Sequence, residues 1–151
     1  MRIILVCLMV CLWGCSKNSN RKQIIGTWEI DSVYTYYNRF DQSLGKSDDR
    51  PVYSYGKNGI MHEIKGELGE KSFFYEFIGN DSLFIHPTSS GNEAYYEIIR
   101  LNRNIMVLKK NKKPVFPGGD QHRYEIRYFS KIGGPKETEV KFEDPRNVSG
   151  N

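Results

Sequence analysis

The sequence predicts an all-β domain: an eight-stranded up-and-down antiparallel meander that closes into a barrel. Three observations support this prediction. Apolar and polar residues alternate with a period of two from Ile24 onward. Turn-forming residues interrupt the alternation at short, nearly even intervals. The 10 tyrosines and 8 phenylalanines are of residue types that strands favour. A two-sheet β-sandwich is the alternative, because strand spacing alone does not distinguish the two architectures.

The expected strands share the period of two and are bounded by Gly, Asn, Pro or Ser. They cover residues 26–37, 51–55, 60–66, 72–78, 83–86, 93–101, 105–110 and 122–131. In the first strand, Trp28 and Ile30 lie on one face, and Glu29 and Asp31 lie on the other. The polar stretch Asn38–Arg50 has no periodicity, which predicts a loop after this strand.

Short turns join the later strands and favour antiparallel pairing. Asn58-Gly59 is a dipeptide typical of a tight hairpin. The other turns are polar and short as well, and they cover residues 79–82, 87–92 and 102–104. A longer loop, Asn111–Gln121, precedes the last strand.

The last expected strand alternates apolar and charged side chains. Tyr124, Ile126 and Tyr128 share one face, which we expect to point into the barrel, and Glu125 and Arg127 share the other. The domain is therefore expected to span residues 24–132. Residues 133–151 are rich in Gly, Pro and charge, which predicts a flexible tail with at most a short strand at Glu137–Phe142.

The first fifteen residues are mostly apolar and contain all three cysteines, of which the last is Cys15. Arg2 precedes an apolar stretch that is shorter than the roughly 20 residues of a membrane span and is typical of a signal peptide. Since no cysteine follows Cys15, we expect no disulfide, no thiolate nucleophile and no cysteine metal site in the domain.

The sequence LWGC, which ends at Cys15, resembles the lipobox of bacterial lipoproteins. The resemblance implies a signal peptide over residues 1–14, and a cysteine that carries acyl chains such as palmitate at the start of a polar tether over 15–23. Each buried methylene contributes about 0.8 kcal/mol, so two or three acyl chains anchor a protein stably. Ser16 after the cysteine favours the outer membrane, facing the periplasm. Exposure at the cell surface is the alternative.

The opening of the domain, IIGTWEIDSV, resembles the first strand of the lipocalin superfamily, where Gly26 and Trp28 match the Gly-x-Trp motif. The pieces that follow, YSYGKNGI, YEFIGNDSLFI and YEIIRLNRNIMVLKK, are similar in order to those of small lipocalin-like lipoproteins of Gram-negative bacteria. The resemblance implies a barrel with Trp28 at its floor and a long loop, Asn38–Arg50, over its mouth. It also implies that either Arg123 or Arg127 stacks on the tryptophan.

Patterns of catalytic and metal-binding residues are missing from the domain sequence. There is no Gly-x-Ser-x-Gly stretch, and His62-Glu63 has no second histidine at zinc-protease spacing. We therefore expect no catalytic residue, no metal and no cofactor. The net charge of +4, or +3 without Arg2, is too small for a nucleic-acid partner. The basic run from Arg100 to Lys113 is expected to be a solvated hairpin, with contact to anionic lipid headgroups as the alternative.

Aromatic side chains are the best candidates for a binding site. Those expected to line the barrel and a ligand are Tyr34, Tyr36, Phe73, Tyr75, Phe77, Tyr96, Tyr124 and Tyr128. Such walls suit a small hydrophobic or amphipathic ligand, although the same rings can also fill a small barrel. The alternative function is a protein-interaction module, an inhibitor or an accessory subunit of an envelope complex, that acts through Asn38–Arg50, Asn111–Gln121 and the tail.

Overall fold

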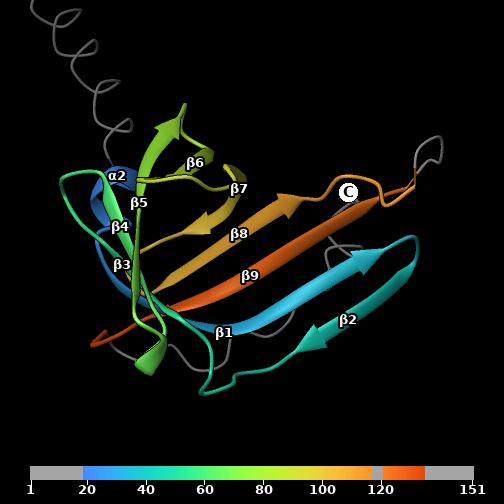
Figure 1. Ribbon diagram of the computed structural model, residues 1–151, viewed down its shortest axis with the longest axis horizontal. Coiled ribbons are helices and arrows are strands. Elements are labelled where there is room, and N and C mark those ends of the chain that lie inside the picture. The colour runs from blue at the N-terminus through green and yellow to red at the C-terminus, as the bar shows by residue number, and fades with distance from the viewer. Residues whose placement is uncertain (1–18, 117–120, 135–151) are drawn as a thin grey trace, which may run out of the picture.

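Nine antiparallel strands form one continuous sheet in the computed structural model, which describes residues 19–116 and 121–134 (Figure 1). The strands are β1 (Gly26–Tyr37), β2 (Phe40–Leu44), β3 (Val52–Tyr55), β4 (Ile60–Ile64), β5 (Glu70–Ile78), β6 (Ser82–Pro87), β7 (Ala94–Leu101), β8 (Ile105–Asn111) and β9 (Arg123–Lys131). A short helix, α2 (Ser19–Gln23), precedes β1, and a 3-10 turn, η2 (Gly66–Leu68), joins β4 to β5. The expected signal peptide, Cys15 and the strand at Glu137–Phe142 lie outside the described residues.

Eight of these strands close into an up-and-down barrel. β1 and β3 to β9 each pair with their neighbour in order, and β9 pairs back onto β1. At this junction Trp28 of β1 is opposite Tyr53 of β3 on one side and Lys131 of β9 on the other. The closure confirms the predicted barrel and excludes the sandwich, because two packed sheets would leave β1 and β9 as separate edges.

The long strand β1 belongs to the barrel only in its first part. It pairs with β3 over Gly26–Glu29, whereas its pairing with β9 continues as far as Tyr37. The distal part of β1 pairs with β2 instead of β3. Strands β2, β1, β9 and β8 therefore project from the barrel as a sheet, called here the projecting sheet (Figure 1).

The prediction of a polar loop over Asn38–Arg50 was wrong, because residues 40–44 form β2. A two-residue turn with positive φ at Asn38 (44°) and Arg39 (78°) reverses the chain directly after β1. All five residues of β2 are exposed, so the backbone pairing with β1 holds a strand that buries no side chain. Such an edge strand leaves no apolar periodicity for sequence analysis to detect.

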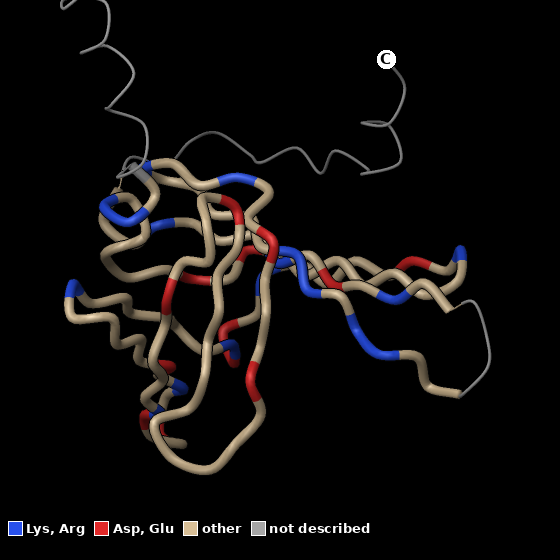
Figure 2. The backbone as a smooth tube through the Cα atoms, turned by 90° about the horizontal axis from the view of Figure 1, so that it is seen from above, with Lys and Arg blue, Asp and Glu red and all other residues tan. Residues whose placement is uncertain are grey.

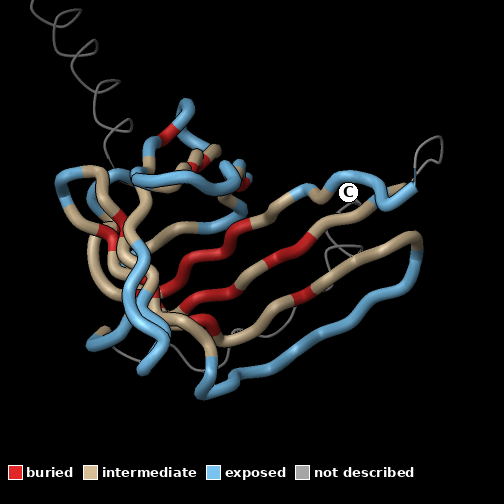
Figure 3. Tube along the Cα trace, in the orientation of Figure 1, coloured by how far each residue is buried: buried red, intermediate tan, exposed pale blue. Residues whose placement is uncertain are grey.

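Buried residues gather along β1, β8 and β9 (Figure 3). They form two clusters, one on each face of the wall that these strands make. The barrel interior holds the larger cluster, in which Trp28, Leu83 and Met106 are fully buried. A bulge between Ile30 and Ser32 shifts the alternation of β1 by one residue. Tyr34 therefore lies in a second cluster on the outer face of the wall.

Candidate functional site

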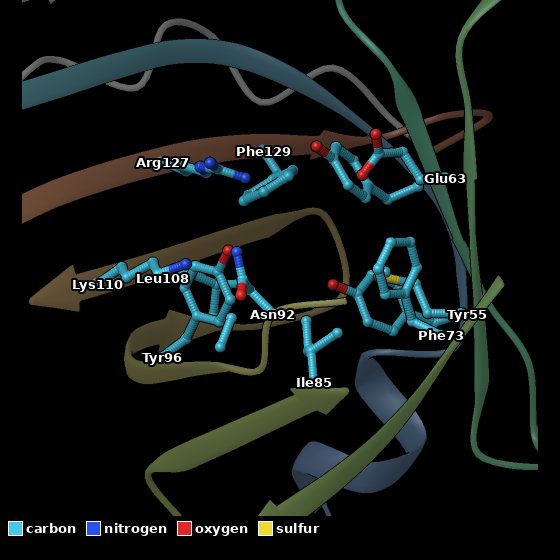
Figure 4. Close-up of a pocket in the computed structure, with 13 residues that line it drawn as sticks. Tyr55, Glu63, Phe73, Ile85, Asn92, Tyr96, Leu108, Lys110, Arg127 and Phe129 are labelled. Carbon is cyan, nitrogen blue, oxygen red and sulfur yellow. The ribbon is translucent and has the colours of Figure 1, made fainter. Parts of the chain in front are cut away.

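A cavity of about 210 Å³ lies toward the open end of the barrel, lined by residues from β3 to β9 (Figure 4). Aromatic side chains form much of its wall: Tyr53, Tyr55, Phe73, Tyr96 and Phe129. Edge-to-face contacts hold three of these rings: Tyr53 packs against Phe129 with centroids 5.7 Å apart, and Tyr55 packs against Tyr75 at 5.1 Å. Such contacts add to area burial and fix ring orientation, so the wall has a defined shape.

Polar groups reach into this aromatic cavity at a few points. The hydroxyls of Tyr55 and Tyr96 and the amide of Asn92 point inward (Figure 4). Burial raises the pKa of Tyr53 to about 12, and burial also raises the pKa of Tyr55 and of Tyr96. The three phenols are therefore neutral hydrogen-bond donors at physiological pH.

One end of the cavity is cationic. Arg127 and Lys110 lie at this end, and Glu63 lies at the other (Figure 4). Arg127 Nε donates to Glu125 Oε1, and Lys112 Nζ contacts Glu125 Oε2. Burial pushes the pKa of Glu125 up, but these two ion pairs outweigh burial and lower it. Glu125 is therefore a buried carboxylate that keeps its negative charge between two cations.

Burial in the cavity wall affects the pKa of both cations that line it. Burial alone would lower the pKa of Arg127, but Tyr96 and Glu125 raise it well above its ordinary value, so the guanidinium remains charged. Burial, and then repulsion from Arg127, lower the pKa of Lys110. The arrangement is typical of a small-molecule pocket, with apolar walls and a few convergent polar groups.

The floor of the barrel is built around Trp28, which is fully buried. Its Nε1 donates to the carbonyl of Ile24 at 2.7 Å. Lys131 Nζ lies 4.9 Å from the centroid of the indole and donates to the carbonyl of Gln23 at 3.1 Å. These contacts bind α2 and the residue after it to the floor, so the expected tether over 15–23 ends in a docked helix. Gly26 has a φ of 129°, and a Cβ there would overlap the Lys131 side chain.

The expected stacking of Arg123 or Arg127 on Trp28 was wrong. Arg123 lies over Tyr37 and Arg127 lies over Tyr96, each with its guanidinium carbon under 6 Å from the ring centroid. The register of β9 explains this, because it places Lys131 opposite Trp28.

The eight aromatic residues expected at the ligand fall into three groups. Phe73 and Tyr96 line the cavity. Tyr75 and Phe77 pack in the interior cluster. The other four, Tyr34, Tyr36, Tyr124 and Tyr128, lie on the outer face of the wall, where Tyr36 and Tyr124 stack at 4.8 Å.

The inward face of β9 is the opposite of the predicted one. Arg127 and Phe129 line the cavity, Glu125 lies on the same face of β9, and the alternating Tyr and Ile residues face outward. The sequence did contain one signal for this orientation. Phe129 lies two residues after Arg127, so an apolar residue shares the face of β9 that carries Glu125 and Arg127. Tyr53, Tyr55 and Lys110 were also missed as site residues.

The two segments expected to act as mouth loops lie at the end of the projecting sheet, where Asn38 of the first bonds to His122, the residue that follows the second. The backbone N–H of Asn38 donates to the carbonyl of His122 at 3.1 Å, and that of His122 donates to Asn38 Oδ1 at 3.0 Å. An open groove here is lined by Tyr36, Tyr124 and three basic residues, Lys109, Lys112 and Arg123, among others. Figure 2 shows basic and acidic residues interspersed along this sheet.

The basic residues between Arg100 and Lys113 do not share one surface, because β8 directs neighbouring side chains to opposite faces of the sheet. Lys109 lies on the outer face, 3.2 Å from Glu97 and over the ring of Tyr124, whereas Lys110 lines the cavity. The alternation of β8 thus directs two consecutive lysines to opposite faces of the sheet.

The histidines do not approach one another. His62 contacts Glu70 and Ser72, His86 packs between Phe74 and Phe84, and His122 lies at the end of the projecting sheet. Over residues 19–116 and 121–134, no three His, Cys, Asp or Glu side chains are grouped in a way that would hold a metal ion. Within the same residues, no helix has the length and apolar character to cross a membrane.

The structure therefore defines a small closed β-barrel with an aromatic cavity and a cationic end. Compared with known proteins, the chain matches no protein-family model and no curated protein.

Proposed function

We propose that this protein is a cell-envelope lipoprotein, anchored through Cys15, whose lipocalin-like barrel binds a small hydrophobic or amphipathic molecule. The observation that carries the proposal is the 210 Å³ cavity, which has aromatic walls and polar groups confined to a few points. A barrel that served only as a scaffold would be expected to fill this volume with side chains. The proposed activity is binding without catalysis, and it needs no cofactor.

The proposed anchor places the domain at the outer membrane, facing the periplasm. Docking of α2 on the barrel floor is consistent with this arrangement, because it holds the N-terminal end of the domain against the floor. A Cys15→Ser variant should lose incorporation of labelled palmitate and fractionate away from the membrane. Retention of both label and membrane association in this variant would contradict the anchor.

Native mass spectrometry of the chain purified gently from its own envelope tests the ligand. A discrete additional mass that is lost on denaturation is expected. An Ala94→Leu variant, which places a larger side chain in the cavity wall, should lose this mass. Tyr95→Leu is the matched control, because Tyr95 is the neighbouring, exposed residue of β7. A chain that carries no ligand, or a ligand retained in Ala94→Leu, would overturn the proposal.

A protein-interaction module is the second candidate function. The supporting observation is that exposed apolar side chains lie on the two segments at the end of the projecting sheet: Phe40 is 78% exposed, and Phe116 is 64% exposed. Exposed rings of this kind are typical anchors of protein interfaces. Cross-linking in intact envelopes should then yield a defined partner that a Phe40→Ser, Phe116→Ser double variant no longer captures. An unchanged cross-linking pattern in this variant would refute the module.

A further inference from the structure

The cationic end of the cavity has hydrogen-bonding capacity left for a ligand. Arg127 uses its Nε for Glu125, and no hydrogen bond within the described part of the chain uses its two Nη atoms. Arg127 lines the cavity at this end (Figure 4). A guanidinium fork of this kind matches a carboxylate, which accepts two parallel hydrogen bonds from it.

Lys110 supplies a second positive charge at the same end. It is opposite Glu125 in the pairing of β8 with β9, and its Nζ lies 5.5 Å from the centroid of Tyr96. The two oxygens of Glu125 are engaged by Lys112 and Arg127, and Lys110 makes no ion pair with any described residue. Three cations therefore share one carboxylate. Burial lowers the pKa of Lys110, and repulsion from Arg127 lowers it further.

The opposite end of the cavity determines how an anion would be oriented. Glu63 lies there, away from Arg127 and Lys110 (Figure 4). Its negative charge would repel a carboxylate and would favour the orientation with the carboxylate at the cationic end. Tyr96 and Asn92 point into the cavity beside the cationic end, and both can donate further hydrogen bonds there (Figure 4).

The cavity volume limits the rest of the ligand. An apolar protein cavity of about 150 Å³ accommodates benzene. The 210 Å³ found here therefore holds an apolar body slightly larger than one ring. A long acyl chain or a whole phospholipid exceeds this volume and would have to extend out of the barrel.

From these features we infer that the cavity takes a small carboxylic acid with a ring-sized apolar body, and that Arg127 and Lys110 bind its carboxylate. The inference rests on the proposed function and adds the chemical class of the ligand. The acid lies with its apolar body against the rings of Tyr55 and Phe73 and with its charge at the inner face of β8 and β9.

Isothermal titration calorimetry with two compounds of equal size tests the inference. The probes are 3-phenylpropanoate and the uncharged 3-phenylpropan-1-ol, titrated at neutral pH into the purified full chain. We expect the acid to bind at least tenfold more tightly than the alcohol. Lys110→Gln and Arg127→Lys should each weaken binding of the acid about tenfold and so reduce the preference for the acid over the alcohol. Lys109→Gln is the matched control, because it removes the same charge from the outer face of β8, and it should change neither affinity.

Three results would overturn the inference. If the alcohol binds as tightly as the acid, the cavity still binds ligands, and only the anion site is rejected. If Lys109→Gln weakens the acid as much as Lys110→Gln does, the effect is one of overall charge and not of the cavity. If neither compound binds, the inferred ligand class is rejected, whereas the proposed function is decided separately by the mass of the envelope-purified chain.

Discussion

Replacing Trp28 by phenylalanine should destabilise the barrel by about 3 kcal/mol. Three losses contribute. The bond from Nε1 to the carbonyl of Ile24 disappears inside the floor, which costs about 1–2 kcal/mol because the buried acceptor loses its partner. The smaller ring removes packing from a fully buried position, at about 1 kcal/mol. The interaction with Lys131 weakens by about 0.5 kcal/mol, because phenylalanine is a poorer cation partner than tryptophan.

Equilibrium urea unfolding measures this loss. Far-UV circular dichroism should be the probe, because the substitution removes the fluorophore of the floor. The midpoint should fall while the slope with urea stays constant, since nearly the same surface becomes exposed on unfolding. A loss of this size also lowers the melting temperature by roughly 10 °C.

Two further variants identify the cause of the loss. Lys131→Met keeps most of the aliphatic stem but removes the charge over the indole and the bond to Gln23, so it should cost about 1 kcal/mol. Tyr95→Phe is the control for an aromatic change at an exposed site, and it should cost less than about 0.5 kcal/mol. A loss below about 1 kcal/mol for Trp28→Phe would refute the view that this side chain holds the floor together.

Three further predictions concern acid stability, the hairpin and the surface. The pKa of Glu125 is lowered in the folded state, so its ionised form stabilises the fold fully above the unfolded pKa, and this contribution is lost as the pH falls through the folded pKa. Glu125→Gln should therefore lose less stability than the parent between pH 7 and pH 3, measured by urea unfolding. An equal loss in the two proteins would contradict the ion-pair assignment. Gly59 has a φ of 77°, so Gly59→Ala should destabilise by about 1–2 kcal/mol in thermal unfolding, and an unchanged melting temperature would show that the turn adapts. Lys46→Ala should change stability by less than about 0.5 kcal/mol, because the 2.8 Å pair with Glu29 is exposed to solvent; a larger loss would show that this pair is coupled to the sheet.

Most of the barrel could be predicted because its signals are local. Asn58-Gly59 marks a hairpin in which Gly59 takes a positive φ, and it joins β3 to β4 as expected. The alternation that places Trp28 inside is likewise visible within β1. Short, evenly spaced hairpins leave few ways to pair eight strands, so the meander follows from the sequence pattern.

The site was predicted only in part, because the face of the sheet that a side chain occupies depends on features outside the local pattern. Extrapolating the alternation from Ile30 would turn Tyr34 inward, but the bulge before Ser32 turns it outward. The faces of β9 were assigned from apolar character, which favoured Tyr128 over Arg127. Charged residues inside a barrel contradict the usual rule of apolar interiors, and here ion pairs join Arg127 and Lys112 to Glu125.

The sequence by itself determined the all-β class, the hairpin order and the inward position of Trp28, because these depend on the side-chain period and on turn residues a few positions apart. Only the tertiary structure decided the closure of β9 onto β1, the pairing of the polar β2, and the meeting of Lys110 with Arg127 at one end of a cavity. Closure pairs residues about a hundred positions apart, such as Trp28 and Lys131. The free energy of such a pairing depends on which faces of the strands pack together, and each bulge changes those faces.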